Sequence, residues 1–204
     1  MLLHPTYFPN IAHFKAMISS ENLIFEVCDN YQKQTYRNRA EIYAANGKLA
    51  LSVPVSYTQK HRQQTKDVLI SGTEQWQAQH LKSLDSAYRM SPFYEFYRDD
   101  LRPIFNTKFK YLLDVTLMSF ELLCECLELN IDYKLSDEYA PHDNEPNDYR
   151  YLVNAKVKDE SQFLKYTQVF TQKHGYLPNL SILDLLFNEG PNTINHLNNL
   201  DLNN

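Results

Sequence analysis

The first 28 residues constrain the fold most, because a helix pattern stands between two short apolar segments. Leu2-Leu3-His4 predicts a short strand, and residues 10–20 predict a helix that Asn10 caps. Residues 23–28 are mostly apolar without alternation, which predicts a buried strand. Strand, helix and strand in this order predict a βαβ unit with a right-handed crossover. The carboxyl ends of both strands then meet at one edge of the sheet, where open α/β sheets bind ligands.

A hairpin and several helices are predicted after this unit. Residues 40–45 and 48–55 flank Asn46-Gly47, a strong hairpin signal, and residues 68–70 predict one more short strand. Helical patterns occupy residues 76–88, 93–105, 109–129, 161–175 and 180–188, the fourth beginning at a Ser161 cap. The predicted class is α/β with an α+β leaning. Its βαβ unit and hairpin form a small mixed sheet that several helices pack against.

The chain length predicts one domain over residues 1–204. The composition is 43% hydrophobic and 13% aromatic, which is enough for a substantial core. Residues 136–160 begin with a stretch rich in Asp, Glu, Asn and Pro, and they predict a mobile loop. The Asn-rich residues 195–204 predict a frayed tail.

Several classes of protein are excluded by what the sequence lacks. No apolar run approaches the ~18 residues of a membrane span, and the start lacks the pattern of a secretory signal. Three cysteines, an odd number, do not form a disulfide framework. We therefore expect a reduced, cytoplasmic protein. No metal-ligand spacing and no nucleotide or hydrolase motif is present, so we expect no metal and no cofactor. The sequence does not define an oligomeric state.

The net charge of −5 hides a basic region. Residues 29–66 hold seven basic and two acidic side chains, whereas residues 114–148 hold ten acids and one lysine. A basic region on an acidic chain predicts steering of an anion to one place, and the alternative is a chance cluster on a solvated surface. Within this region, residues 29–39 have no aliphatic side chain and combine basic, amide and tyrosine groups. This composition is typical of a pocket for a polar, anionic ligand.

The first candidate site joins the ends of the two predicted strands. Arg37 and Arg39 are two residues apart, so an extended backbone points both guanidinium groups to one side, where they hold a carboxylate or phosphate. The alternative is that one of them pairs with a core carboxylate. His4 is a candidate catalytic residue. The residues predicted to contact the substrate are Tyr7, Asn30, Lys33, Tyr36, Arg37, Asn38 and Arg39.

Two further candidates lie later in the chain. His80 follows Trp76 by one helical turn and is either a general acid or base or a core histidine with one hydrogen bond. Trp76 itself is a candidate substrate contact, as are Tyr88 and Arg89, which follow His80 later in the chain. Asp184 stands in a segment that is apolar on nearly every side, so its carboxylate needs a partner. Either Arg37 or Arg39 is predicted to pair with it, and a catalytic role is the alternative.

These blocks together resemble the WbqC-like family of bacteria. The matching segments are Pro5–Pro9, Asn30–Arg39, Lys66–Val68, Trp76-x-x-x-His80, Ala87–Phe93 and Leu177–Pro191, the last of which adds Asn179 as a candidate substrate contact. The match covers roughly residues 2–130 and 162–198, and residues 136–160 depart from the longer family form. The resemblance implies a link to O-antigen, lipopolysaccharide and other surface-polysaccharide gene clusters. It also implies a transferase role, with glycine or another aminoacyl group as the suggested cargo, and it supplies no established catalytic residue.

Three functions remain open at this point. The first is a transferase that acts on a nucleotide-sugar or sugar intermediate, which is a small anionic or sugar substrate held by Lys33, Arg37 and Arg39. The second is a non-catalytic protein that binds a glycan or nucleotide with the same residues. The third is RNA recognition by the basic stretch and its tyrosines. An acidic pI of 5.8 argues against nucleic acid as the partner.

Overall fold

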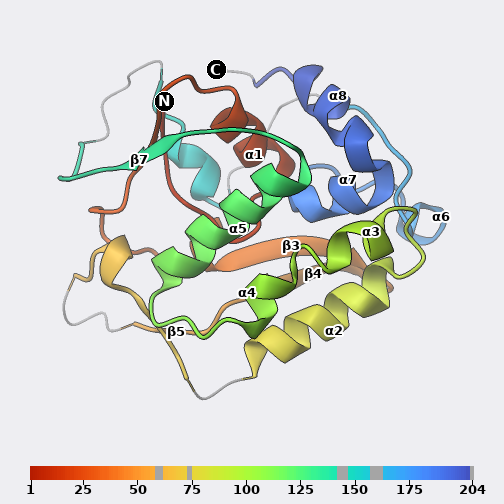
Figure 1. Cartoon of the computed structure of the whole chain (residues 1–204), viewed down its shortest axis with the longest axis horizontal. Coiled ribbons are helices and arrows are strands. Elements are labelled where there is room, and N and C mark those ends of the chain that lie inside the picture. The colour runs from red at the N-terminus through yellow and green to blue at the C-terminus, as the bar shows by residue number, and fades with distance from the viewer. Residues whose placement is uncertain (58–61, 73–74, 142–146, 157–162, 203–204) are drawn as a thin grey trace.

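The structure, a computed structural model, describes residues 1–57, 62–72, 75–141, 147–156 and 163–202 (Figure 1). The strands are β1 (Leu2–Leu3), β2 (Leu23–Phe25), β3 (Arg39–Ala44), β4 (Gly47–Ser52), β5 (Val55–Ser56), β6 (Leu69–Ile70) and β7 (Tyr133–Leu135). The helices are α1 (Ile11–Ile18), α2 (Trp76–Tyr88), α3 (Tyr94–Arg98), α4 (Arg102–Asn106), α5 (Leu112–Cys126), α6 (Thr171–His174), α7 (Ile182–Glu189) and α8 (Thr193–Asn198). Short 3₁₀ helices lie at Tyr36–Asn38, Thr65–Asp67, Arg150–Val153 and Gly190–Asn192.

The predicted βαβ unit is confirmed. Asn10 caps α1 by accepting the N–H of His13 at 2.8 Å, and β1 pairs in parallel with β2. The third strand of this sheet, β7, pairs in parallel with the other side of β2 and was not predicted. Beyond β1, Leu2 exchanges two backbone hydrogen bonds with residues 147–149. The sheet therefore joins the first 25 residues to segments more than 100 residues later.

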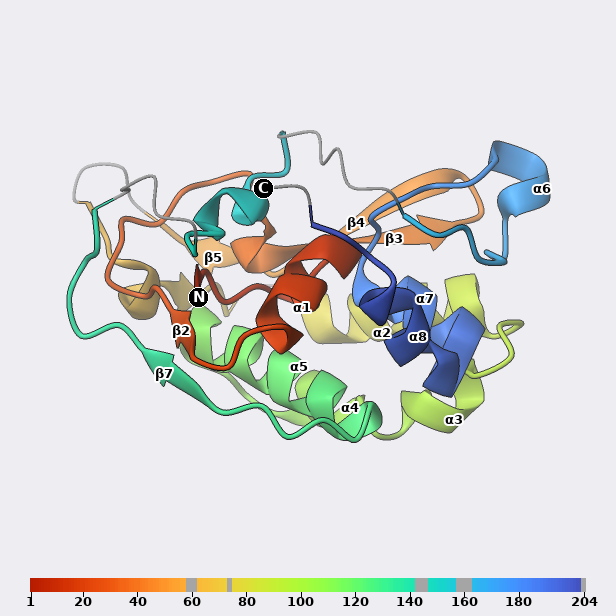
Figure 2. The same ribbon diagram turned by 90° about the horizontal axis from the view of Figure 1, so that it is seen from above.

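The predicted α/β class is confirmed, although the strands are distributed over three small sheets. The hairpin β3–β4 turns at Asn46-Gly47 as predicted and forms its own antiparallel sheet, and β5 and β6 form another. The hairpin contacts α2 on one side and α7 on the other (Figure 1). Figure 2 places β2 and β7 at one end of the molecule and α3 and α6 at the other. One hydrophobic cluster extends from Leu3 to Leu200, and α6 contributes no buried residue to it.

Two predicted helices differ from the structure. The segment 93–105 divides into α3 and α4, because Pro103 lacks an N–H and fits only the first turn of a new helix. Residues 163–168 are not helical, so a helix over 161–175 is wrong, and only α6 remains; Ser161 lies outside the described residues. The side chains of Tyr166 and Gln168 instead bind the core carboxylate of Asp184. These polar contacts override the helical spacing of the apolar residues.

The backbone at Gly190, between α7 and α8, lies close to the ring of Phe93. Helix α7 begins at a Ser181 cap and ends at Gly190, whose φ of +55° suits glycine. A Cβ atom at Gly190 would lie 2.5 Å from the ring of Phe93, so no larger residue fits.

Residues 195–202, expected to fray, include the last turn of α8 and the buried Leu197 and Leu200. None of the helices in the described ranges has the length and apolar character needed to span a membrane.

Candidate functional site

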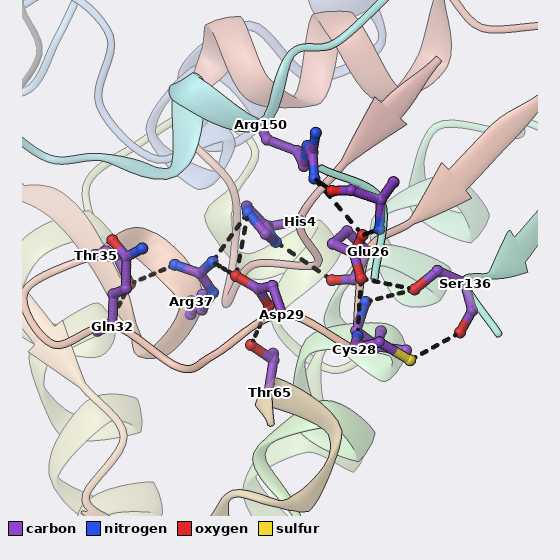
Figure 3. Close-up of polar contacts among 12 residues, drawn as sticks. His4, Glu26, Cys28, Asp29, Gln32, Thr35, Arg37, Thr65, Ser136 and Arg150 are labelled. Carbon is purple, nitrogen blue, oxygen red and sulfur yellow. Dashed lines mark hydrogen bonds and ion pairs between the residues drawn. The ribbon is translucent and has the colours of Figure 1, made fainter. Parts of the chain in front are cut away.

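The structure brings His4, Asp29 and Arg37 together at the carboxyl ends of β1 and β2 (Figure 3). His4 directly follows β1, Asp29 follows β2, and the 3₁₀ helix at Tyr36–Asn38 carries Arg37 back toward them. Arg37 Nη2 donates to Asp29 Oδ2 and lies 2.9 Å from His4 Nε2. All three side chains are buried. The sheet edge predicted to gather polar groups therefore does so, in the form of one buried cluster, which we call the Arg37 cluster.

The hydrogen bonds of His4 define its neutral form. Its Nδ1 lies 3.3 Å from the carbonyl oxygen of Glu26, which only accepts, so the proton is assigned to Nδ1. Nε2 then accepts from the guanidinium of Arg37. Burial lowers the pKa of His4 well below its usual value, and the positive charge of Arg37 lowers it further. His4 is therefore a neutral imidazole at neutral pH, with its proton on Nδ1 and a lone pair on Nε2 that accepts from Arg37.

Asp29 balances the charge of Arg37. Thr65 Oγ1 donates to Asp29 Oδ1 at 2.6 Å, and the Thr65 backbone N–H donates to the Asp29 carbonyl at 2.9 Å. Burial raises the pKa of Asp29, while Arg37 and Thr65 pull it back down. Burial likewise lowers the pKa of Arg37, and Asp29 opposes that shift. Each charge is paired, so the cluster holds a buried ion pair rather than an isolated charge.

Arg37 and Arg39 each keep a buried Nε–H that has no hydrogen-bond partner among the described residues. Arg37 Nη1 is also weakly engaged, 3.4 Å from Thr35 Oγ1. Because Arg37 lies in a 3₁₀ helix, the extended backbone assumed for the predicted clamp is absent, and Arg37 has the core carboxylate that was the alternative. Buried donors without a partner are rare and costly, so each one calls for an explanation.

A second buried ion pair lies behind the first (Figure 3). Glu26 Oε1 accepts from the Cys28 N–H and from Ser136 Oγ, both at 2.8 Å. Arg150 Nη1 lies 3.6 Å from Glu26 Oε2, and Arg150 also binds Asp148 and two backbone carbonyls. Arg150 thereby connects Ala140, Pro141 and Asp148, three residues of the segment expected to be mobile, to Glu26 at the end of β2.

A groove of about 550 Å³ opens beside this second ion pair. Its floor includes Leu2, Ile24 and Leu135 from the three parallel strands, and its wall includes Ser136 and Arg150. Neither Arg37 nor Arg39 lines the groove. The groove and the Arg37 cluster are therefore separate features of the sheet edge, and Arg150, which lines the groove, pairs with Glu26.

His80 lies in a separate buried cluster with Tyr7 and Trp76. The Tyr7 hydroxyl is 3.0 Å from His80 Nδ1, and the Trp76 ring meets the His80 ring edge-on at 5.2 Å. Burial lowers the pKa of His80 to about 4, against a smaller opposing effect of the Ser52 carbonyl. With one nitrogen facing Tyr7 and a backbone carbonyl also nearby, His80 matches the alternative of a core histidine. Burial also raises the pKa of Tyr7 well above its usual value.

No arginine of the described residues pairs with Asp184, so the predicted pairing with Arg37 or Arg39 is wrong. Its carboxylate accepts from the Tyr88 hydroxyl at 2.7 Å, the Tyr166 hydroxyl at 2.6 Å and the Gln168 amide at 2.9 Å. Three neutral donors, and a position in the first turn of α7, satisfy the charge without a cation. Burial raises the pKa of Asp184, and these hydrogen bonds pull it back down. We call this group the Asp184 cluster.

The remaining predicted residues are dispersed. Asn179 Oδ1 accepts the Ala12 N–H at 3.0 Å, Asn38 Nδ2 donates to the Val53 carbonyl at 2.8 Å, and the Tyr36 hydroxyl donates to Glu41 at 3.3 Å. These contacts connect elements of the fold. Asn30 and Lys33 are exposed near the Arg37 cluster. Arg89 is exposed at the end of α2 and, with Asp85 and Arg98, lines a separate hollow of about 440 Å³.

Sequence reasoning missed several members of the polar cluster. Glu26 and Arg150 were not singled out, because one lies in an apolar strand pattern and the other in an acidic loop. The isolated Glu26 within residues 23–28 was a usable signal, since a buried carboxylate needs partners. His13 was also missed; its Nε2 donates to the His4 carbonyl at 2.9 Å, and burial lowers its pKa to about 4. In the described ranges, no three His, Cys, Asp or Glu side chains are arranged to hold a metal ion.

The fold and this cluster define an α/β protein whose buried polar side chains gather at the carboxyl edge of a small parallel sheet. The chain belongs to the WbqC-like protein family, whose model matches residues 4–158. It is 25% identical over 227 residues to the uncharacterized protein Rv1507c of Mycobacterium tuberculosis (strain H37Rv), with 96% of each chain covered. No solved structure matches the chain. The matched family range includes both buried ion pairs and ends before Asp184.

Proposed function

We propose that this protein is a transferase of surface-polysaccharide biosynthesis that binds a nucleotide-sugar or sugar intermediate at the Arg37 cluster. The observation that carries the proposal is the pair of buried Nε–H donors on Arg37 and Arg39 without a partner in the described residues. An anionic group on the substrate supplies two acceptors for these donors. Membership of the WbqC-like family supports the pathway through the resemblance described above.

The transferred group in this proposal is glycine or another aminoacyl group. In such a reaction an amine or hydroxyl of the acceptor attacks the activated carbonyl of the aminoacyl donor and loses a proton to a base. The bond between that carbonyl and the donor's leaving group then breaks, and the leaving group departs with the electron pair. His4 is the better candidate for that base, because its Nε2 is unprotonated and touches only Arg37 and Asp29. An anion that draws Arg37 toward itself frees the Nε2 lone pair of His4. His80 and Asp184 lie in clusters of their own and act in the proposal as positioning residues.

The proposal is tested by binding and by transfer with the same variant. Purified protein is titrated calorimetrically with a panel of nucleotide-sugars, and glycyl transfer is followed by mass spectrometry. Arg39→Gln is expected to weaken binding at least tenfold, because one charge-assisted contact contributes about 1.5–3 kcal/mol. The melting temperature should remain near that of the wild type, because Arg39 forms no ion pair with the described residues.

Arg102→Gln is the matched control, since Arg102 is exposed on α4 and its guanidinium lies 3.5 Å from Asp99 on the surface. It should leave binding and transfer unchanged. The proposal fails if no nucleotide-sugar binds, or if Arg39→Gln binds and reacts like the wild type.

A non-catalytic binding protein is the second candidate, and one observation favours it. The side chains of His4, His80 and Asp184 are each buried and hydrogen-bonded within the protein. Recovery of a tightly bound ligand unchanged after long incubation with activated glycine would decide for this candidate. RNA recognition is less well supported, because Tyr31 and Tyr43 of the basic stretch are buried and offer no open stacking surface.

A further inference from the structure

Two tyrosine rings and a lysine lie next to the Arg37 cluster. The rings of Tyr31 and Tyr57 meet at 5.2 Å with their planes 55° apart. Lys33 Nζ stands 5.3 Å from the centre of the Tyr57 ring. Tyr31 is buried, Tyr57 is half-buried and Lys33 is exposed. The group therefore extends from the interior to the surface, where the flexible ammonium of Lys33 lies over the Tyr57 ring.

Tyr31 connects this ring pair to the arginines. Its backbone N–H donates to the Gln63 carbonyl at 2.9 Å, and the adjacent Asn30 forms a bridge with Gln64, so its position is fixed. Burial raises the pKa of Tyr31 to about 12, and the charges of Arg37 and Arg39 both act to lower it. The Tyr31 side chain thus lies within the field of both guanidinium groups while its ring packs on Tyr57.

The charges at this place do not cancel. Arg37 is balanced by Asp29, but neither Arg39 nor Lys33 forms an ion pair with a carboxylate in the described part of the chain. Two uncompensated positive charges therefore flank the ring pair, because Arg39 acts on Tyr31 and Lys33 lies over Tyr57. A carboxylate supplies one negative charge and a phosphate monoester supplies nearly two at neutral pH, so a phosphate matches this place better. Planar guanidinium groups also fit phosphate oxygens well.

We infer that the ligand beside the Arg37 cluster is a nucleoside phosphate, with its phosphate held by Arg39 and Lys33 and its base against the Tyr57 ring. This inference rests on the proposed function and narrows its substrate class. Lys33 serves two partners in turn: its ammonium covers the aromatic face in the free protein and moves to the phosphate when a base takes that face. Stacking on an aromatic ring accepts any base, so the site selects nucleotides as a class.

The test compares ligands that share only one part of a nucleotide. Wild-type protein is titrated with UDP, ADP, uridine, pyrophosphate and glucose 1-phosphate at constant salt. UDP and ADP should bind at least tenfold more tightly than pyrophosphate or glucose 1-phosphate, and uridine should bind weakly. Tyr57→Ala should remove about a tenfold advantage for the nucleotides, as expected for the loss of one base–aromatic stack. Tyr57→Phe should keep it.

Matched variants separate the outcomes. Tyr139→Ala, at an exposed tyrosine lining neither the ring pair nor the cluster, and Lys82→Ala, at an exposed lysine of α2, should bind UDP like the wild type. Lys33→Ala should weaken UDP and pyrophosphate about equally. If Tyr57→Ala destabilises the fold, Tyr57→Leu retains the apolar packing and still removes the stack.

The failure of the inference and that of the proposed function give different patterns. Equal affinity for UDP, pyrophosphate and glucose 1-phosphate, unchanged in Tyr57→Ala and lost in Arg39→Gln, overturns the nucleotide assignment and leaves anion binding in place. Absence of binding by every phosphate-containing ligand overturns both.

Discussion

The Arg37 cluster and the Asp184 cluster both bury a carboxylate, but they satisfy it in different ways. Asp29 has a cation, a hydroxyl and a neighbouring imidazole around it. Asp184 has three neutral donors and no cation. The Asp184 cluster ties α2, α7 and residues 166–168 together through these hydrogen bonds. The Arg37 cluster leaves guanidinium donors unused. Unused hydrogen-bonding capacity, rather than burial or charge alone, distinguishes the candidate site from the structural cluster.

The largest effect is expected from removing the cation of the Arg37 cluster. Arg37→Met leaves Asp29 buried without its partner, which should lower the free energy of unfolding by about 3–5 kcal/mol at pH 7. Urea denaturation measures this loss. The pKa of Asp29, already raised by burial, then rises further, so the deficit should shrink as the pH falls and Asp29 takes up a proton.

Adding Asp29→Asn to Arg37→Met should recover part of the loss, because no charge then remains unpaired. A double variant that is less stable than the single one would refute the ion-pair account.

A smaller loss is expected in the second cluster. Asp184→Ala leaves the hydroxyls of Tyr88 and Tyr166 and the amide of Gln168 without their acceptor, which should cost roughly 3 kcal/mol. UDP binding, measured at a temperature where the variant is fully folded, should be unaffected, since this cluster contacts no proposed ligand group. Asp132→Ala, at an exposed aspartate, is the control and should change stability little. Loss of UDP binding in a folded Asp184→Ala variant would contradict the structural role of the Asp184 cluster.

The smallest effect concerns pH. The pKa of His80 is lowered to about 4 in the folded protein, below its usual 6.5, so the unfolded chain binds the proton first as the pH falls. His80 therefore contributes stability that is present above pH 6.5 and declines toward pH 4. The stability difference between wild type and His80→Asn should shrink by about 2 kcal/mol between pH 7 and pH 5, as measured by urea denaturation.

The raised pKa of Asp184 acts in the opposite direction, which is why the variant is compared at each pH rather than the wild type alone. A difference that stays constant over this range would show that His80 is not kept neutral by burial.

Local patterns predicted much of the fold. The strand–helix–strand order, the Asn10 cap and the Asn46-Gly47 turn each depend on residues close in sequence, and each is present. The sheet's third strand, β7, has three residues, too few for any periodicity to show. The nonhelical course of residues 163–168 depends on hydrogen bonds to Asp184, and these contacts form only in the folded protein.

The candidate site was predictable as a place but not as a set of contacts. Two strand ends at one sheet edge bring His4 near residues 29–39, and this follows from topology. The identity of the acid that pairs with Arg37 does not follow from topology. Arg37 lies in the 3₁₀ helix at Tyr36–Asn38 and is buried, whereas Arg39 begins β3. Arg37 pairs with Asp29 and not with Asp184, the partner that the sequence suggested. Arg150 joins from a segment whose composition suggested only a loop.

The N-terminal strand is enclosed by late parts of the chain. Residues 147–149 bond one side of β1, and β7 bonds the far side of β2. During synthesis on the ribosome, β1 and β2 are made early, and the sheet cannot form completely until β7 and residues 147–149 have also been synthesised. Assembly of this edge thus depends on loop closures spanning more than half the polypeptide, which are slow and leave apolar strands temporarily uncovered. The nascent protein is consequently most vulnerable to aggregation in the interval between synthesis of residue 25 and residue 149.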